Sequence, residues 1–215
     1  MKAFIFDLDG VIVFTDKFHY QAWKTTADSI GVYFDETINN RLRGVSRAES
    51  LDIILERHSG ILSADEKANL MEEKNNIYRK LLDTMKPADI SDEVRPTLDE
   101  LRQRGFKLAI GSSSKNTVFI LEKIQLRGAF DAISDGNNIT RSKPDPEVFL
   151  KAALYLGEKP QDCVVIEDAV AGIDAAKAAG MITVGIGDAA SYKKADYTIR
   201  SFAELLNIEI FKEPK

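Results

Sequence analysis

Cysteine is almost absent from this sequence: Cys163 is the only one among 215 residues, so no disulfide can form within the chain. It lies in the apolar run 163–166, which favours a buried, unreactive thiol. Also lacking is any apolar run long enough to span a membrane. The apolar stretch after Lys2 reaches Asp7 too early for the core of a signal peptide, so we expect a cytoplasmic protein with no membrane partner.

A surplus of basic residues is lacking as well. The chain has 29 Lys and Arg against 34 Asp and Glu, which gives a formal net charge of −5. Such a balance does not attract a phosphate backbone, so a nucleic-acid partner is not expected. The hydrophobic fraction of 44% and the charged fraction of 29% are typical of a globular protein. The length suffices for one domain, or for one domain with an insertion.

The first segment of the chain combines a buried strand with two carboxylates. Four apolar residues, 3–6, predict a strand buried on both faces, and Asp7, Asp9 and Gly10 follow it. Carboxylates at i and i+2 project from the same side of a strand end, which is where open parallel sheets bind ligands. Two like charges held together favour a bound cation, and hard oxygen ligands favour Mg²⁺. A plain Asp-Gly turn after a strand is the alternative.

Two patterns divide the chain. Helix signals dominate residues 15–87, whereas helices and strands alternate beyond Pro87. The helix signals are a segment from Phe18 to about Gly31 and capping-box spacings at Ser46/Glu49 and Ser63/Glu66. Strands are expected at 106–111, 132–133, 164–166 and 182–184, with a last helix capped by Ser201 and Glu204. The pattern predicts a doubly wound parallel α/β fold with a Rossmann-like core, residues 1–14 and 88–215, and an inserted all-helical cap, residues 15–87.

Three further polar segments follow the ends of predicted strands. They are Gly111-Ser112-Ser113-Ser114-Lys115-Asn116, Ser142-Lys143-Pro144-Asp145-Pro146 and Glu167-Asp168. The first offers hydroxyls, helix-start N–H groups and a lysine, which together can cradle a phosphate. The second holds Lys143 on a loop stiffened by two prolines, and the third can complete an oxygen-ligand set with Asp7 and Asp9. A solvated helix cap and an acidic turn are the plain alternatives, and 185–188 predicts a turn only.

Taken in order, Asp7-x-Asp9-Gly10, Ser112, Lys143 and Glu167-Asp168 resemble the four motifs of the haloacid dehalogenase-like superfamily, over nearly the whole chain. Within the superfamily the chain is similar to the sugar phosphomutases. That similarity rests on Gly10-Val11-Ile12, Thr15, His19, Ala22-Trp23-Lys24, Arg43-Gly44-Val45-Ser46-Arg47, Ser63-Ala64, Lys74-Asn75, Pro87-Ala88-Asp89, Ser114-Lys115-Asn116 and Ser142-Lys143-Pro144. The stretch 44–47 is the most telling, because simple phosphatases of the superfamily do not need it.

The resemblance implies a role for each matched residue. Asp7 would be the nucleophile that takes up a phosphoryl group, and Asp9 the general acid and base. Further catalytic residues would be Ser112, Lys143 and His19. Mg²⁺ would be held by Asp7, the backbone carbonyl of Asp9, Glu167 and Asp168. Substrate-binding residues would be Trp23, Gly44, Val45, Ser46, Arg47, Lys74, Asn75, Ser113, Ser114, Lys115 and Asn116, with Arg47 on the non-reacting phosphate and with His19 and Trp23 on the cap surface near the sugar.

The activity implied by the resemblance is the interconversion of β-D-glucose 1-phosphate and glucose 6-phosphate, with β-glucose 1,6-bisphosphate as activator and intermediate. Sugar phosphates would be the partners, and we expect a monomer. Three other functions fit the same residues: a Mg²⁺-dependent sugar-phosphate phosphatase, a mutase for another sugar phosphate, and a signalling domain that accepts phosphate on an aspartate. The helical insertion and the Asp7-x-Asp9 pair argue against the signalling domain.

Overall fold

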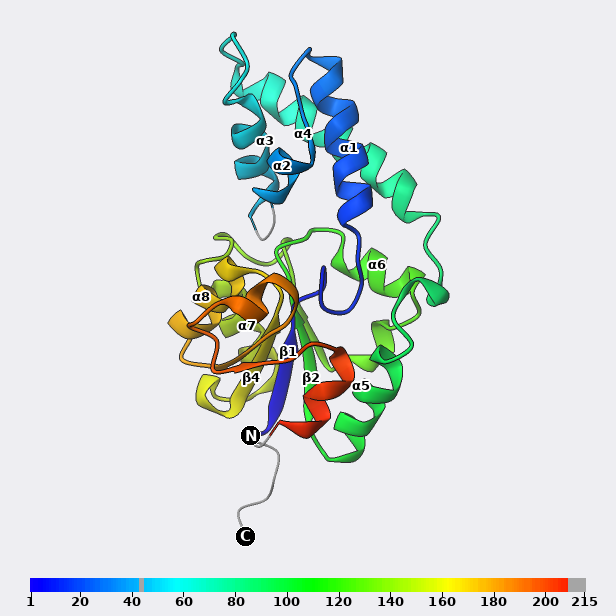
Figure 1. The fold of residues 1–215 in the computed structure, drawn as a ribbon, viewed down its shortest axis with the longest axis vertical. Helices are drawn as coiled ribbons and strands as arrows, with labels where there is room; N and C mark the ends of the chain where they lie inside the picture. Colours follow the sequence, from blue (N-terminus) through cyan, green and yellow to red (C-terminus); the bar gives the residue numbers. More distant parts are fainter. Residues whose placement is uncertain (43–44, 209–215) are drawn as a thin grey trace. The chain divides into compact units, whose positions relative to one another are not determined.

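The computed structural model describes residues 1–42 and 45–208, which divide into two compact units (Figure 1). One unit combines Met1–Phe14 with Lys86–Lys215, and the other is Thr15–Met85. The first contains the sheet, whereas all the regular elements described in the second are helices. In the described ranges, no helix is both long and apolar enough to cross a membrane.

A six-stranded parallel sheet forms the centre of the first unit. Its strands are β1 (Ala3–Phe6), β2 (Lys107–Gly111), β3 (Ala132–Ser134), β4 (Cys163–Glu167), β5 (Ile182–Gly185) and β6 (Tyr197–Thr198). Their order is β3-β2-β1-β4-β5-β6, with every neighbouring pair parallel. This confirms the predicted doubly wound α/β fold. It places β1 between β2 and β4, where the order of crossover reverses and open sheets bind their ligands.

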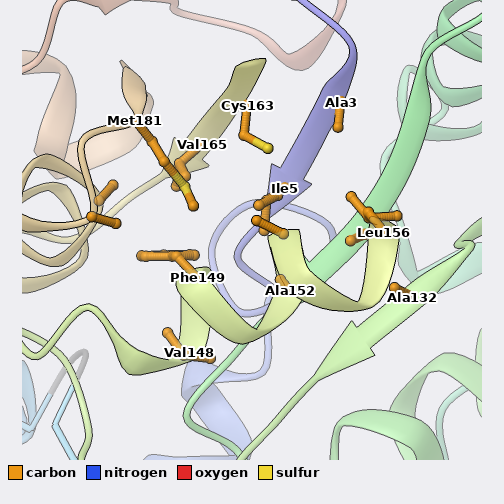
Figure 2. Close-up of a cluster of buried hydrophobic side chains, with 14 of the residues drawn as sticks. Ala3, Ile5, Ala132, Val148, Phe149, Ala152, Leu156, Cys163, Val165 and Met181 are labelled. Atoms are coloured by element: carbon orange, nitrogen blue, oxygen red, sulfur yellow. The ribbon is translucent and has the colours of Figure 1, made fainter. Parts of the chain in front are cut away.

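Helices cover both faces of the sheet. This arrangement buries the first strand, which is apolar on both sides. The helices are α5 (Val94–Gln103), α6 (Thr117–Lys123), α7 (Glu147–Leu156) and α8 (Val170–Ala178). Ala3 and Ile5 pack in a cluster with residues of α7 and α8, among them Phe149 and Ala152 (Figure 2). The alternate residue Phe6 faces the other way, where its ring lies 5.7 Å from that of Phe202. A strand covered on both faces can therefore dispense with polar residues until its end, at Asp7.

The described residues of the second unit form four helices. They are α1 (Asp16–Ser29), α2 (Glu36–Asn40), α3 (Arg47–Leu55) and α4 (Ala64–Leu82). Both predicted capping boxes are present, at Ser46 before α3 and at Ser63 before α4. At each box the glutamate carboxylate accepts from the backbone N–H of the serine, and the serine Oγ accepts from the backbone N–H of the glutamate. Two backbone donors are thus satisfied at each helix start. The five-residue α2 was not expected from the sequence, since so short a helix shows no periodicity.

Three details near the C-terminus differ from the prediction. The segment after Ser201 is a short 3₁₀ helix, η5 (Phe202–Asn207), and Ser201 makes no side-chain cap bond. The expected turn after β5 runs into another 3₁₀ helix, η4 (Gly187–Ser191). The two residues of β6 were missed. The remaining 3₁₀ helices are η1 (Pro87–Asp89), η2 (Arg127–Ala129) and η3 (Pro160–Asp162).

Candidate active site at the carboxyl end of the sheet

Asp7 lies where three neighbouring strands end. It directly follows β1, and its backbone N–H donates to the carbonyl of Ile166 in β4 (2.9 Å). The parallel register pairs the preceding residue, Phe6, with Ile110 of β2 and Ile166 of β4, so Asp7 comes next to the strand ends at Gly111 and Glu167. Asp7 is buried, with 7% of its surface exposed. A carboxylate therefore stands at the central strand of the sheet, at the edge predicted to bind a ligand.

Lys143 donates hydrogen bonds to two carboxylates that are distant from it in the sequence. Its ammonium donates hydrogen bonds to Asp7 and to Oε1 of Glu167 (2.5 Å), and its side chain is 2% exposed. Burial disfavours the charged ammonium, but the two carboxylates attract it and hold the pKa of Lys143 above its ordinary value. A fixed positive charge thus stands beside Asp7.

Three carboxylates converge at the same place. Asp7, Glu167 and Asp168 each offer an oxygen within 4.8 Å of the others. Burial, with repulsion from neighbouring carboxylates, raises the pKa of Asp7 to about 7, although Lys143 opposes the shift. Burial and repulsion from Glu167 and Asp7 likewise raise the pKa of Asp168 to about 8. Crowded oxygen ligands that resist ionisation by themselves fit a divalent cation, which would stabilise their charged forms.

Two glycines make room for these carboxylates. Gly10 has a φ of +83°, and a Cβ there would lie 2.0 Å from Oδ2 of Asp168. The sequence indicated Gly10 as a point of sharp turning and close approach. Gly172 in α8 was missed: a Cβ there would lie 1.8 Å from Oε1 of Glu167. No motif in the sequence marks Gly172, because its constraint comes from a side chain on another element.

Asp9 lies near the three clustered carboxylates, and its charge contributes to the raised pKa values of Asp7 and Asp168. It is half-buried, and its backbone pairs with Val13 in an isolated bridge while the N–H of Gly10 donates to the carbonyl of Val13 (2.8 Å). The group of clustered carboxylate oxygens found in the described residues does not include Asp9. The metal contact predicted for the backbone carbonyl of Asp9 stays a prediction.

The segment between β2 and α6 is shaped by its own serines. Oγ of Ser112 accepts from the N–H of Ser114, and Oγ of Ser114 accepts from the N–H of Asn116 (both 3.2 Å). Ser113 Oγ is buried and, among the residues that the structure describes, has no hydrogen-bond partner. Ser112 and Asn116 are buried and Lys115 is exposed. Their predicted contacts with phosphate stay predictions.

The segment after β3 braces this loop, which the sequence did not reveal. The N–H of Gly136 donates to the carbonyl of Ser114 (3.1 Å), and the side-chain amide of Asn137 donates to the carbonyl of Lys115 (3.0 Å). A Cβ at Gly136 would lie 2.4 Å from the carbonyl oxygen of Ser113. No motif in the sequence marks Gly136 or its neighbours. Their support for the loop arises from the pairing of β2 with β3.

The predicted residues of the helical unit gather around Lys74. This lysine of α4 is 2% exposed, and its ammonium lies 2.9 Å from Nδ1 of His19 in α1. It also lies over the rings of Trp23 (4.9 Å) and Tyr78 (4.4 Å). Burial, with the charges of Lys74 and Arg47, holds the pKa of His19 well below its ordinary value, so this imidazole is neutral near pH 7.

One expectation for this unit is wrong. Trp23 is 2% exposed and belongs to the unit's apolar core, so it does not lie on the surface. Its large ring gains more by packing against the other helices than it would by facing solvent. Sequence reasoning also overlooked Tyr78, which stacks on His19 with ring centroids 4.2 Å apart and donates to the hydroxyl of Thr15 (3.0 Å).

Arg47 begins α3 and reaches α4. Its guanidinium donates to Oδ1 of Asn75 (2.9 Å), and Ser46 caps the helix in front of it. Arg47, Asn75 and Val45 are all partly buried. Gly44, also predicted to bind substrate, lies outside the described residues. The structure thus brings Arg47 and Asn75 together, 28 positions apart in the sequence.

Comparisons with known proteins agree with this arrangement. The family described as haloacid dehalogenase-like hydrolase matches residues 1–180. The β-phosphoglucomutase of Bacillus subtilis is 41% identical over 99% of this chain and 95% of its own length. The crystal structure of β-phosphoglucomutase from Clostridium difficile superposes with a TM-score of 0.89 at 41% identity, covering 95% of this chain and 93% of that one. A phosphorylated carbohydrates phosphatase of Thermotoga maritima is 32% identical over 84% of this chain and 82% of its own.

Proposed function

The chain belongs to the haloacid dehalogenase-like hydrolase family, and from that membership we propose that it has β-phosphoglucomutase activity. The reaction interconverts β-D-glucose 1-phosphate and glucose 6-phosphate. The observation that carries the proposal is the buried Asp7, which is hydrogen-bonded to Lys143 and grouped with Glu167 and Asp168. In that set Asp7 can take up a phosphoryl group, and the ammonium of Lys143 can offset part of its negative charge. The extent of similarity to the two mutases favours isomerisation over hydrolysis.

In the proposed mechanism, Asp7 acts as the nucleophile. One carboxylate oxygen attacks the phosphorus of a bound bisphosphate, the bond from phosphorus to the sugar oxygen breaks, and an aspartyl phosphate forms. Asp9 donates a proton to the departing sugar oxygen. In the reverse direction Asp9 takes the proton of the attacking hydroxyl, and the phosphoryl group passes from Asp7 to the sugar. Lys143 orients Asp7 through its hydrogen bond and lowers the charge on the transferring group.

A second phosphate-binding site explains how the two isomers interconvert. Arg47 would bind the non-reacting phosphate in a bidentate way, steadied by Asn75. A bisphosphate bound in one orientation presents its 1-phosphate to Asp7, and in the other orientation its 6-phosphate. β-Glucose 1,6-bisphosphate is therefore both the intermediate and the activator that first phosphorylates Asp7. Ser114, Lys115 and Asn116 would assist with the same phosphate.

The acidic group would hold Mg²⁺ through Asp7, Asp168 and the backbone carbonyl of Asp9, with Glu167 close by. Three convergent oxygens and the raised pKa values of Asp7 and Asp168 fit this ion. When bound, it supplies positive charge that keeps the carboxylates ionised and offsets the charge of the phosphoryl group. Glu167 also accepts from the N–H of Ala169 (2.8 Å) through Oε2, so its oxygens are already directed by Lys143 and this backbone group.

Phosphorus NMR tests the proposal directly. The protein is incubated with β-glucose 1-phosphate, Mg²⁺ and a catalytic amount of glucose 1,6-bisphosphate. We expect the signal of glucose 6-phosphate to grow while inorganic phosphate stays near its starting level, and we expect no conversion by Asp7→Asn. Release of inorganic phosphate as the main product would instead identify a phosphatase. Turnover by the Asp7→Asn variant would refute the role of Asp7 as the nucleophile.

A further inference from the structure

The ammonium of Lys143 has a third neighbour besides its two carboxylates. It lies over the ring of Phe149, 4.8 Å from the ring centroid. Phe149 is fully buried in α7, and Lys143 is itself 2% exposed. The face of an aromatic ring carries partial negative charge, and its attraction for a cation is stronger where water is excluded. We propose that Phe149 is a positioning residue for phosphoryl transfer, whose ring holds the Lys143 ammonium in place by a cation–π interaction.

Hydrogen bonding alone leaves the ammonium incompletely satisfied. An ammonium has three N–H donors, and among the residues that the structure describes two acceptors are recorded for Lys143, on Asp7 and Glu167. The ring attracts the whole charge and does not require a particular N–H. It can therefore stabilise the buried cation while the third donor remains available for an oxygen of the transferring phosphoryl group.

The ring is itself held firmly. Phe149 belongs to the cluster that packs α7 against the sheet, beside Ile5 (Figure 2). At the end of β2, a Cβ on Gly111 would lie 2.7 Å from Cδ1 of the Phe149 ring and 3.1 Å from Cγ2 of Ile5. The ring thus occupies space that only a glycine at this strand position leaves open. Because protein interiors are close-packed, the ring and the ammonium over it have little freedom to shift.

This inference rests on the proposed function, since Lys143 matters there as the charge that meets the transferring group. Phe149 touches neither substrate nor reacting atoms in that mechanism and acts only through Lys143. Charge stabilisation of this kind is felt most in the transition state. Loss of the ring's attraction should therefore lower kcat more than it changes KM.

A series of fluorinated phenylalanines at position 149 tests the proposal with little change of shape. Mono-, di- and trifluorophenylalanine progressively remove the negative charge of the ring face. We expect kcat for β-glucose 1-phosphate to fall stepwise, by about 3- to 30-fold at three fluorines, with KM changed less than about 2-fold. The control is the same series at Phe202, which is also buried and for which no cation contact is recorded in the described residues. A flat kcat across the Phe149 series would overturn the inference.

A measurement of stability keeps the inference separate from the proposed function. Urea unfolding is followed for the Phe149 series with Lys143 present and with Lys143→Met, which retains length without charge. We expect fluorination to lower the unfolding midpoint in the first background and to leave it nearly unchanged in the second. Equal shifts in both would show that the ring only packs, and would overturn the inference. If the protein isomerises no sugar phosphate, the proposed function fails, but this coupling still decides the role of the ring.

Discussion

At the scale of single residues, Asp7 and Asp9 differ sharply although they are two positions apart. Asp7 is buried and hydrogen-bonded to Lys143, whereas Asp9 is half-buried and outside the group of carboxylates. The first environment suits a nucleophile with nearby positive charge, and the second suits a group that exchanges protons with substrate. We therefore propose separate roles for the two carboxylates, and each role can be tested without the other.

Replacing Asp9 with Asn should suppress turnover more than binding. The substitution preserves shape but removes the proton donor and acceptor, so kcat should fall about 10²- to 10⁴-fold. KM for β-glucose 1-phosphate should change by less than about 3-fold, and the far-UV circular dichroism spectrum should match that of the parent. Steady-state kinetics of the purified variant check this. An unchanged kcat with a raised KM would make Asp9 a binding residue.

The pH dependence of stability should report the crowded carboxylates. The pKa values of Asp7 and Asp168 in the folded, metal-free protein, about 7 and about 8, lie above the ordinary value of 3.8. Between about pH 4 and 8 the folded protein therefore retains protons that the unfolded chain releases. The contribution of these groups to the free energy of unfolding is full below about pH 4 and is lost as pH rises through 7 and 8.

A divalent cation should restore the stability that the protein loses at higher pH, because it binds the ionised carboxylates. Mg²⁺ should therefore raise Tm more at pH 8 than at pH 5, relative to protein in EDTA. Thermal unfolding at the two pH values measures the difference. The variant Asp168→Asn, which lacks one of the crowded carboxylates, serves as the control and should show a weaker response at pH 8. An equal rise at both pH values in the parent would contradict the proposed metal ligands.

At the scale of elements, α8 affects the site through a missing side chain. Alanine in place of Gly172 would favour the helix by up to about 1 kcal/mol, yet its Cβ would lie 1.8 Å from Oε1 of Glu167. We expect the clash to outweigh the gain in helix propensity at this position. Glu167 must move away from the new Cβ, which breaks its hydrogen bond with Lys143. We expect Gly172→Ala to lower kcat roughly 10- to 100-fold. The urea concentration at the unfolding midpoint should change little.

Gly128→Ala is the matched control for this variant. Position 128 has an ordinary backbone φ, and nothing lies within 4 Å of a Cβ built there. Activity of the control should stay within about 2-fold of the parent. Full activity of Gly172→Ala would show that Glu167 can relax without moving Lys143, and would remove the proposed link between α8 and catalysis.

At the scale of the whole molecule, the proposed reaction needs both compact units to bind one substrate. Asp7 belongs to the unit with the sheet, and Arg47 to the helical unit. Arg47→Ala should lower isomerisation of β-glucose 1-phosphate by roughly 10- to 100-fold, since a charge-assisted phosphate contact contributes about 1.5–3 kcal/mol. Hydrolysis of acetyl phosphate, which has no second phosphate, should change little.

The exposed Arg57 of the same unit provides the control, because Arg57→Ala removes the same charge at a position given no role in binding. It should affect neither reaction by more than about 2-fold. Both reactions are followed by phosphorus NMR under the same conditions. An equal loss of activity on the two substrates after Arg47→Ala, or no loss on either, would count against two phosphate-binding sites and would favour a phosphatase.

Much of the fold could be predicted because its signals are local. Apolar runs marked β1, β2, β4 and β5, and Ser-x-x-Glu spacings marked the starts of α3 and α4. The misses were short: α2 has five residues and β6 has two, too few to show a period. The burial of Trp23 was also missed, since a ring of that size can face either the solvent or its own unit's core, and only the packing of α1 against other helices settles this.

By itself, the sequence determined the class of fold, the family and the residue types gathered at the strand ends, because strands buried on both faces allow polar residues only where they stop. Tertiary structure alone decided how those residues meet. Lys143 reaches Asp7 across 136 positions and Glu167 across 24. Gly172 and Phe149 acquire their importance from side chains on other elements. Burial then raises the pKa of Asp7, a property that depends on surroundings which no local pattern contains.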